Sequence, residues 1–141
     1  MNLVYWDTML FVYWLETHPV HHRAVKNLFD RMEARKDRLC TSLFTIGEIL
    51  VGPYRQGQGD EAFRIKAVFR SPLVEILPFT VAVADRYAQI RAAHPVKPAD
   101  AIHLASAAEA GVDLFVTNDR HLHSLVIPGI RFITGMDLRI T

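Results

Sequence analysis

Short runs of residues that favour β-strands alternate with longer stretches of helical periodicity along almost the whole chain. Five such runs are apolar or β-branched, and the stretches between them carry apolar residues three and four positions apart. Strands that are separated by helices pair in parallel, because each crossover helix returns the chain to the end of the sheet at which the previous strand began. A parallel sheet needs helices on both faces to cover its side chains. The pattern therefore predicts an α/β fold around a central, mostly parallel five-stranded sheet.

The expected elements follow one another without a linker long enough to divide the chain. At 141 residues and without internal repeats, the sequence is predicted to form one domain, residues 1–141. Gly52 and Pro53 are expected to end the third helix, and Gly111 the last one. The predicted strands cover 3–6, 38–41, 73–77, 113–116 and 131–134, and the predicted helices cover 8–16, 19–35, 43–51, 61–70, 81–93 and 98–110.

The composition is that of a globular protein with an almost neutral overall charge. Half of the residues are hydrophobic, 22% are charged, and the formal net charge at pH 7 is +1. Bulk charge therefore gives no support for a nucleic-acid partner, and any basic surface would have to be local. The apolar start of the chain is interrupted by Asp7 and lacks the basic residues of a signal peptide, so we expect no membrane segment there. The single cysteine, Cys40, has no partner for an internal disulfide, which fits a cytoplasmic protein.

Three of the 15 acidic residues stand alone in segments that are otherwise suited to burial. Asp7, Glu48 and Asp100 are each the only formally charged residue in a stretch of more than ten. Removing a lone carboxylate from water costs several kcal/mol unless a partner compensates its charge. No Lys or Arg lies in these stretches, so the compensation must come from elsewhere. A bound cation would supply it.

A fourth acid, Asp119, joins this set because of its position in the predicted fold. Asp7 follows the first strand and Asp119 follows the fourth, so both stand at carboxyl ends, where parallel sheets form their binding sites. Asp100 lies in the first turn of the helix that leads into the fourth strand, and Glu48 lies in the middle of a helix. We therefore expect all four at one edge of the sheet. A ligand set of carboxylate oxygens alone suits Mg²⁺ or Mn²⁺ rather than zinc.

Three of the four acids also have an interpretation that requires no ligand. Asp7 is suited to cap the helix that begins at Thr8, and Asp100 to interact favourably with the dipole of its helix. Asp119 is suited to a turn or to a cap. Glu48 has no such explanation, because it lies in mid-helix among apolar neighbours. The metal hypothesis therefore depends on the four residues as a set.

Four short motifs occur in an order that resembles the PIN-domain family. They are VYWDTMLFVYWLE around Asp7, TIGEIL around Glu48, PADAIHLASA around Asp100, and VTND, which ends at Asp119. Within that family, the chain is similar in length and motif order to the small VapC-type toxins of bacterial type II toxin–antitoxin modules. The last two motifs carry most of the resemblance.

The resemblance implies a three-layer α/β sandwich and a ribonuclease that depends on Mg²⁺ or Mn²⁺. It also implies an RNA substrate, a separate small antitoxin protein and a homodimer. Two alternatives stay open: a PIN-type nuclease that processes RNA outside a toxin module, and a catalytically silent module that binds RNA or protein. Carried over by position, the catalytic and metal-binding residues would be Asp7, Glu48, Asp100 and Asp119.

Several neighbours of these acids are candidates for supporting roles. Thr117 matches the polar residue that often supports the final acid in the family, and Thr8 is a similar candidate beside Asp7. Arg120 is expected near the site because it follows Asp119 directly. His103 shares a helix face with Asp100, three residues earlier, and is a further candidate for a supporting contact.

Overall fold

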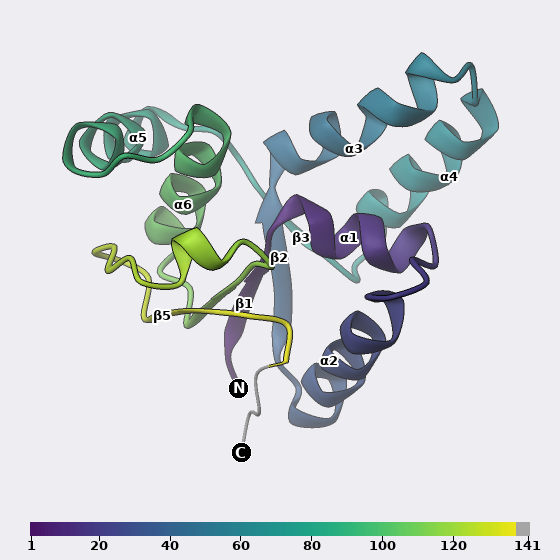
Figure 1. Ribbon diagram of the computed structural model, residues 1–141, viewed down its shortest axis with the longest axis horizontal. Coiled ribbons are helices and arrows are strands. Elements are labelled where there is room, and N and C mark those ends of the chain that lie inside the picture. The colour runs from purple at the N-terminus through teal and green to yellow at the C-terminus, as the bar shows by residue number, and fades with distance from the viewer. Residues whose placement is uncertain (138–141) are drawn as a thin grey trace.

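The computed structural model describes residues 1–137, and its central sheet has five strands that all run parallel (Figure 1). Their order in the sheet is β3-β2-β1-β4-β5. The chain therefore starts in the middle of the sheet, builds one side, and then returns to build the other, with a topological switch point between β1 and β4. The strands are β1 (Leu3–Trp6), β2 (Arg38–Ser42), β3 (Glu75–Leu77), β4 (Leu114–Val116) and β5 (Phe132–Thr134).

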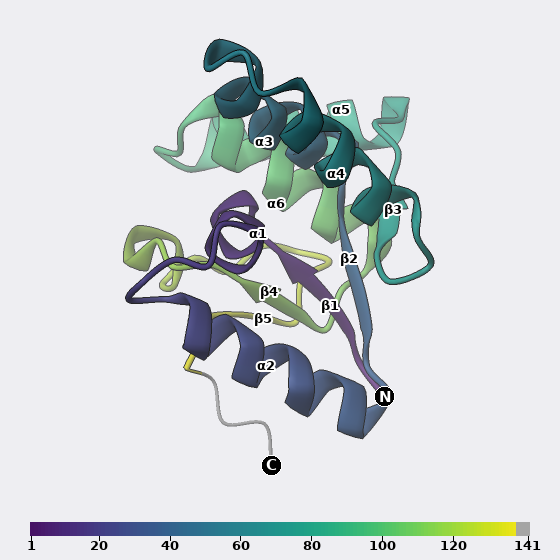
Figure 2. The same cartoon turned by 90° about the vertical axis from the view of Figure 1, so that its right-hand side faces the viewer.

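Helices cover both faces of this sheet, as Figure 2 shows for α6 on one side and α2 on the other. The fold is thus the three-layer α/β arrangement expected from the sequence. None of the helices within residues 1–137 has the length and hydropathy to span a membrane. The helices are α1 (Thr8–Leu15), α2 (His22–Arg35), α3 (Leu43–Arg55), α4 (Gly59–Arg70), α5 (Val81–Ala93), α6 (Pro98–Ala110) and the short 3-10 helix η1 (Arg120–Leu122).

The central strand β1 supplies side chains to two separate apolar cores. Val4 and Trp6 point to one face, where they pack in a cluster with residues from α1 to α4. Tyr5 points to the other face, toward α5 and α6, because successive side chains of a strand alternate between faces. Its ring stacks on that of Phe115 from β4, with the ring centroids 5.0 Å apart. All of these side chains are fully buried, so β1 is anchored on both sides and its carboxyl end is fixed in position.

The predicted strands and the last two helices agree closely with the structure, and Gly111 caps α6 in the left-handed conformation. The prediction that the third helix ends at Gly52 and Pro53 is wrong, since α3 continues to Arg55. Pro53 removes only one backbone donor, and its ring is buried against the rest of the protein. The next backbone groups remain paired, with the N–H of Gln56 donating to the carbonyl of Gly52 at 3.1 Å.

The second helix begins at His22 rather than at Pro19, where the sequence predicted it. The imidazole of His18 explains the delay. Its Nδ1 accepts the backbone N–H groups of Val20 and His21, both at 3.1 Å. A side chain that binds the backbone in this way offers it an alternative to helix, so the segment forms a turn before α2 starts.

Candidate metal-binding site

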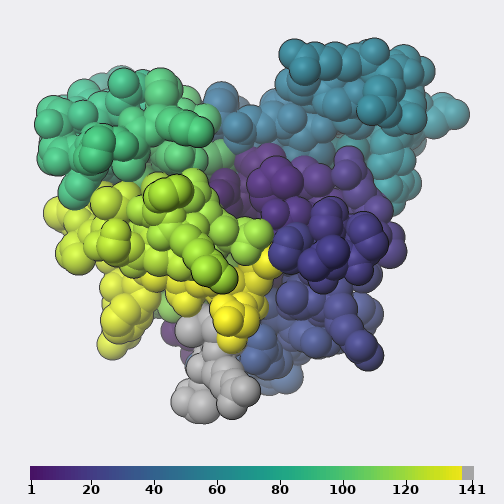
Figure 3. All heavy atoms as spheres, viewed as in Figure 1, coloured from purple at the N-terminus to yellow at the C-terminus, as the bar shows by residue number. Residues whose placement is uncertain are grey.

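A cavity of about 340 Å³ opens beside the carboxyl ends of β1 and β4. The four acids singled out in the sequence all line it, although they come from four distant segments of the chain. Figure 3 shows the surface notched between the atoms of α5 and α6 and those of α3 and α4, with α1 below the notch. A larger cavity of about 830 Å³, at the turn between α3 and α4, contains none of these acids. The acids that line the smaller cavity are Asp7, Glu48, Asp100 and Asp119.

Asp7 is held in place through both of its carboxylate oxygens. Oδ1 accepts the backbone N–H of Thr8 at 2.7 Å, so the residue caps α1 as its position suggested. Oδ2 accepts the hydroxyl of Thr117 at 2.8 Å, and Thr117 in turn accepts the backbone N–H of Asp119 at 3.1 Å. Thr117 is completely buried. Capping and lining the cavity are therefore compatible roles for Asp7, and the loop after β4 is tied to the end of β1.

Glu48 reaches the cavity from the middle of α3 and meets two donors there. Its Oε1 accepts hydrogen bonds from the hydroxyl of Thr8 and from Nε2 of His103, each 2.6 Å long. Partial burial acts to raise the pKa of Glu48, but the two hydrogen bonds outweigh burial, and the net pKa is lowered. The side chain is 30% exposed and lines the cavity.

Asp100 lies in the first turn of α6 and has no hydrogen-bond donor to its side chain within residues 1–137. Burial raises its pKa, and the negative charges of Asp7 and Asp119 raise it further, while His103 and Lys97 act in the opposite direction. The carboxylates of the cavity thus repel one another. That repulsion is what a bound cation would relieve.

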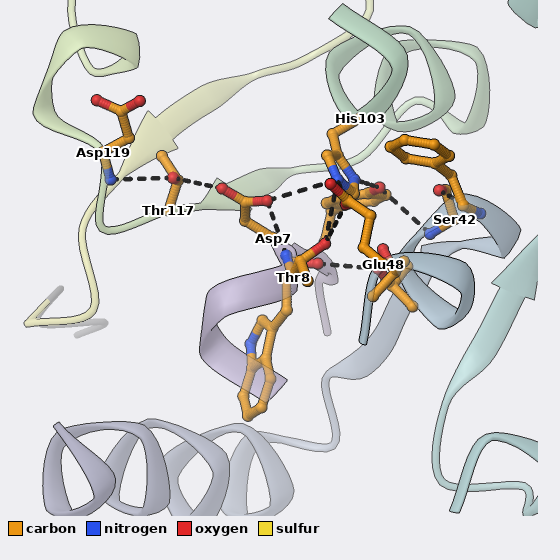
Figure 4. A network of polar contacts seen from close by, with 12 residues as sticks. Asp7, Thr8, Ser42, Glu48, His103, Thr117 and Asp119 are labelled. Atoms are coloured by element: carbon orange, nitrogen blue, oxygen red, sulfur yellow. Dashed lines mark hydrogen bonds and ion pairs between the residues drawn. The ribbon is translucent and has the colours of Figure 1, made fainter. Parts of the chain in front are cut away.

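Asp119 lines the cavity, but its carboxylate points away from Asp7 (Figure 4). It accepts the backbone N–H of His121 at 3.0 Å and caps η1, which is the structural role that its sequence position also allowed. Arg120 is the first residue of η1, and its exposed side chain does not line the cavity. Arg120 is therefore next to Asp119 in the sequence, but its side chain lies at the surface outside the cavity.

The donor set fits a hard divalent cation such as Mg²⁺ or Mn²⁺, because every candidate ligand is a carboxylate. The pKa of Asp100, raised first by burial and then by the charges of Asp7 and Asp119, is compatible with a cation among these carboxylates. Within residues 1–137, however, no three His, Cys, Asp or Glu side chains are already grouped closely enough to hold an ion. The carboxylate of Asp119 is directed away from the other acids, toward the backbone N–H of His121.

Two further residues, His103 and Tyr5, contribute to the site through hydrogen bonds, and Figure 4 shows His103 beside Glu48. His103 is only 2% exposed and contacts Glu48, Thr8 and the hydroxyl of Tyr5, which lies 2.6 Å from Nδ1. The sequence suggested a supporting contact for His103 but gave no partner for it. Tyr5 was not recognised at all, because a tyrosine in an apolar strand is typical of a core residue.

The raised pKa of Asp100 leads to a first prediction. Replacing Asp7 with asparagine removes one of the negative charges that raise it, so the pKa of Asp100 should fall toward the ordinary value of an aspartate. A carbon-detected NMR titration of the Asp100 carboxyl in metal-free protein measures this pKa. Asp85→Asn, on the exposed face of α5, is the matched control and should leave it unchanged. An unaltered pKa in Asp7→Asn would show that the charge of Asp7 does not contribute to the raised pKa of Asp100.

The two shifted carboxyls affect stability in opposite directions as the pH changes. A raised pKa means that the folded protein binds the proton of Asp100 more tightly than the unfolded chain does. Its contribution to stability is complete below the ordinary pKa of aspartate and is lost as the pH rises through the raised value. Glu48, with a lowered pKa, contributes above the ordinary pKa of glutamate and loses that contribution as the pH falls through the lowered value.

The chain belongs to the PIN domain family, whose profile matches residues 4–127 and thus includes all four acids. No curated protein sequence matches it. Among solved structures, it is similar to DNA-bound VapBC from Salmonella typhimurium, with 27% identity and a TM-score of 0.69 over 96% of this chain and 99% of that one.

Two other solved structures share the fold at lower identity. One is VapBC2 from Rickettsia felis bound to a DNA fragment from its promoter, with 17% identity and a TM-score of 0.75 over 94% of this chain and 98% of that one. The other is VapC20 from Mycobacterium tuberculosis, described as a toxin that cleaves the sarcin-ricin loop. It has 19% identity and a TM-score of 0.68 over 87% of this chain and 96% of that one.

Proposed function

We propose that this protein is an endoribonuclease that hydrolyses RNA phosphodiester bonds with Mg²⁺ or Mn²⁺, and that it is the toxin of a toxin–antitoxin pair. The observation that carries the proposal is the meeting of four acids from distant segments in one cavity at the carboxyl ends of parallel strands. Membership of the PIN domain family, matched over residues 4–127, supports nuclease chemistry. We propose that residues 1–141 form one nuclease domain. The similarity to a toxin that cleaves the sarcin-ricin loop supports RNA as the substrate.

In this proposal, the acids of the cavity serve as ligands of the metal ion or as the general base for the attacking water. Asp7 and Asp100 would hold the cation directly, and Asp119 directly or through water. A divalent ion bound there lowers the pKa of a water molecule and neutralises charge on the phosphoryl oxygens; one or two ions fit this scheme. Glu48 either joins the ligands or accepts the proton of the attacking water. Arg120, at the surface next to Asp119, is suited to a phosphate of the RNA.

The hydroxyl groups of Thr8 and Thr117 have a distinct part in this scheme. Thr8 donates to Glu48 and Thr117 donates to Asp7, so each fixes one carboxylate of the cavity. Groups that orient the ligands of a metal commonly matter almost as much as the ligands themselves. Neither threonine needs to touch the cation.

We further propose a small antitoxin protein as the partner, which would cover the acidic cavity with a basic side chain. Similarity to VapBC complexes supports such a partner, and repulsion among the carboxylates would favour an arginine there. The toxin would act in the cytoplasm as a homodimer. Co-purification of a small protein encoded next to this chain would support the toxin assignment, and its absence would favour an RNA-processing nuclease.

Cleavage of a mixed panel of structured and unstructured RNAs tests the nuclease proposal. We expect cutting in Mn²⁺ or Mg²⁺ that EDTA abolishes, and none of single-stranded DNA with the same sequences. Intact RNA binding without metal-dependent cutting would overturn the proposal and identify a catalytically silent binding module instead.

A further inference from the structure

Glu48 is held by a chain of hydrogen bonds that begins inside the sheet and crosses three elements (Figure 4). The hydroxyl of Tyr5, on β1, lies 2.6 Å from Nδ1 of His103, on α6. Nε2 of the same imidazole lies 2.6 Å from Oε1 of Glu48, on α3. It is also 3.7 Å from Oδ1 of Asp7, so the imidazole stands between two acids of the cavity.

The partners at the two ends of this chain determine where its protons lie. The hydroxyl oxygen of Tyr5 accepts the backbone N–H of Ser42 at 3.2 Å, which leaves its own proton to be donated. A phenol keeps its proton at neutral pH, and Nδ1 of His103, 2.6 Å away, is the acceptor to which the hydroxyl donates. At the other end, the ionised carboxylate of Glu48 can only accept. This geometry places a proton of His103 on Nε2, where it faces Oε1 of Glu48.

This tautomer has two consequences for Glu48. Its Oε1 is fixed by two donors, Nε2 of His103 and the hydroxyl of Thr8. Its Oε2 receives no hydrogen bond from the part of the chain that the structure describes, and is therefore left for a cation or a water.

We propose that Tyr5 and His103 are positioning residues for Glu48: Tyr5 selects the tautomer of His103, and His103 fixes the carboxylate before the cation arrives. This inference rests on the metal-dependent function proposed above. A glutamate in the middle of a helix would otherwise lose its rotamer freedom only on binding, at a cost in affinity. Because of these hydrogen bonds, the side chain of Glu48 is already ordered in the folded protein before the cation binds.

Paired substitutions at His103 separate positioning from simple packing. His103→Gln places an amide N–H about where Nε2 lies, whereas the shorter side chain of His103→Asn reaches only the region of Nδ1. Ser106→Ala is the matched control, since Ser106 lies one turn later on α6, is 2% exposed, and its hydroxyl has no partner within residues 1–137. Tyr5→Phe removes the hydroxyl that selects the tautomer and keeps the ring that packs on Phe115.

Mn²⁺ binding, measured by isothermal titration calorimetry, is the first readout. His103→Asn should weaken binding by about 10- to 100-fold, the range typical of losing a group that orients a metal ligand. His103→Gln should recover most of that loss, and Ser106→Ala should bind as the wild type does. Thermal melts of the metal-free variants check that each one folds. If His103→Asn does not fold, Tyr5→Phe carries the test, and it should also weaken Mn²⁺ binding.

The tautomer itself is the second readout and depends on no activity. Nitrogen NMR of the metal-free wild type should show His103 protonated on Nε2, and Tyr5→Phe should show a mixture of tautomers. An Nδ1-protonated imidazole in the wild type, or unchanged Mn²⁺ affinity in a folded His103→Asn, would overturn the inference and leave the ribonuclease proposal standing. A wild type that binds Mn²⁺ but cuts no RNA would overturn the ribonuclease proposal alone.

Discussion

Replacing Asp7 with asparagine should lower the rate of RNA cleavage in Mn²⁺ by about a thousandfold while the protein stays folded. Asparagine caps a helix almost as well as aspartate, so the bond from the backbone N–H of Thr8 can persist. The amide has no negative charge, however, and the cavity loses one of its proposed direct ligands. A thousandfold loss corresponds to about 4 kcal/mol of transition-state stabilisation, a size expected for a disabled metal site. Single-turnover cleavage of a labelled RNA measures it.

Asp30→Asn provides the control for a general effect of removing an acidic charge. Asp30 lies exposed on α2, where it pairs with Lys26 at 3.0 Å, and it lines neither the cavity nor its rim. Its substitution should leave cleavage unchanged. If Asp7→Asn cut RNA as fast as the wild type, Asp7 would be a helix cap and nothing more, and the proposed site would lose its central member.

The sequence alone placed Asp7 and Asp119 correctly because both follow buried strands. In a parallel sheet the carboxyl ends of all strands lie at the same end of the sheet, so residues that directly follow two strands are expected there. That β1 and β4 are neighbours in the sheet is shown by the structure. Asp100 and Glu48 were found by a different signal, a single charge in an apolar stretch. Each of these acids lies on a helix with other residues packed into the cores, while its own side chain lines the cavity.

The orientation of the side chains could not be predicted in the same way. Asp119 turns outward because the backbone N–H of His121 offers it a bond, and the sequence does not show whether η1 forms there. The partnership of Tyr5 and His103 depends on the two lying across the interface between β1 and α6, 98 residues apart in the chain. Only packing decides which buried polar groups meet. The extension of α3 through Pro53 likewise depends on its burial rather than on helix propensity.

Mn²⁺ should raise the melting temperature of the wild-type protein and have no effect on Asp7→Asn or Asp100→Asn. The folded metal-free protein holds carboxylates that repel one another, as the raised pKa of Asp100 indicates, and the unfolded chain does not hold them together. A cation that binds only the folded state, present at a concentration of about a hundred times its Kd, increases the free energy of unfolding by about 2.7 kcal/mol. For a chain of this length, that corresponds to a rise in melting temperature of about 5–10 °C. Differential scanning calorimetry with MnCl₂ and with matched NaCl measures the shift. Equal shifts in Asp100→Asn and the wild type would place the metal elsewhere on the molecule.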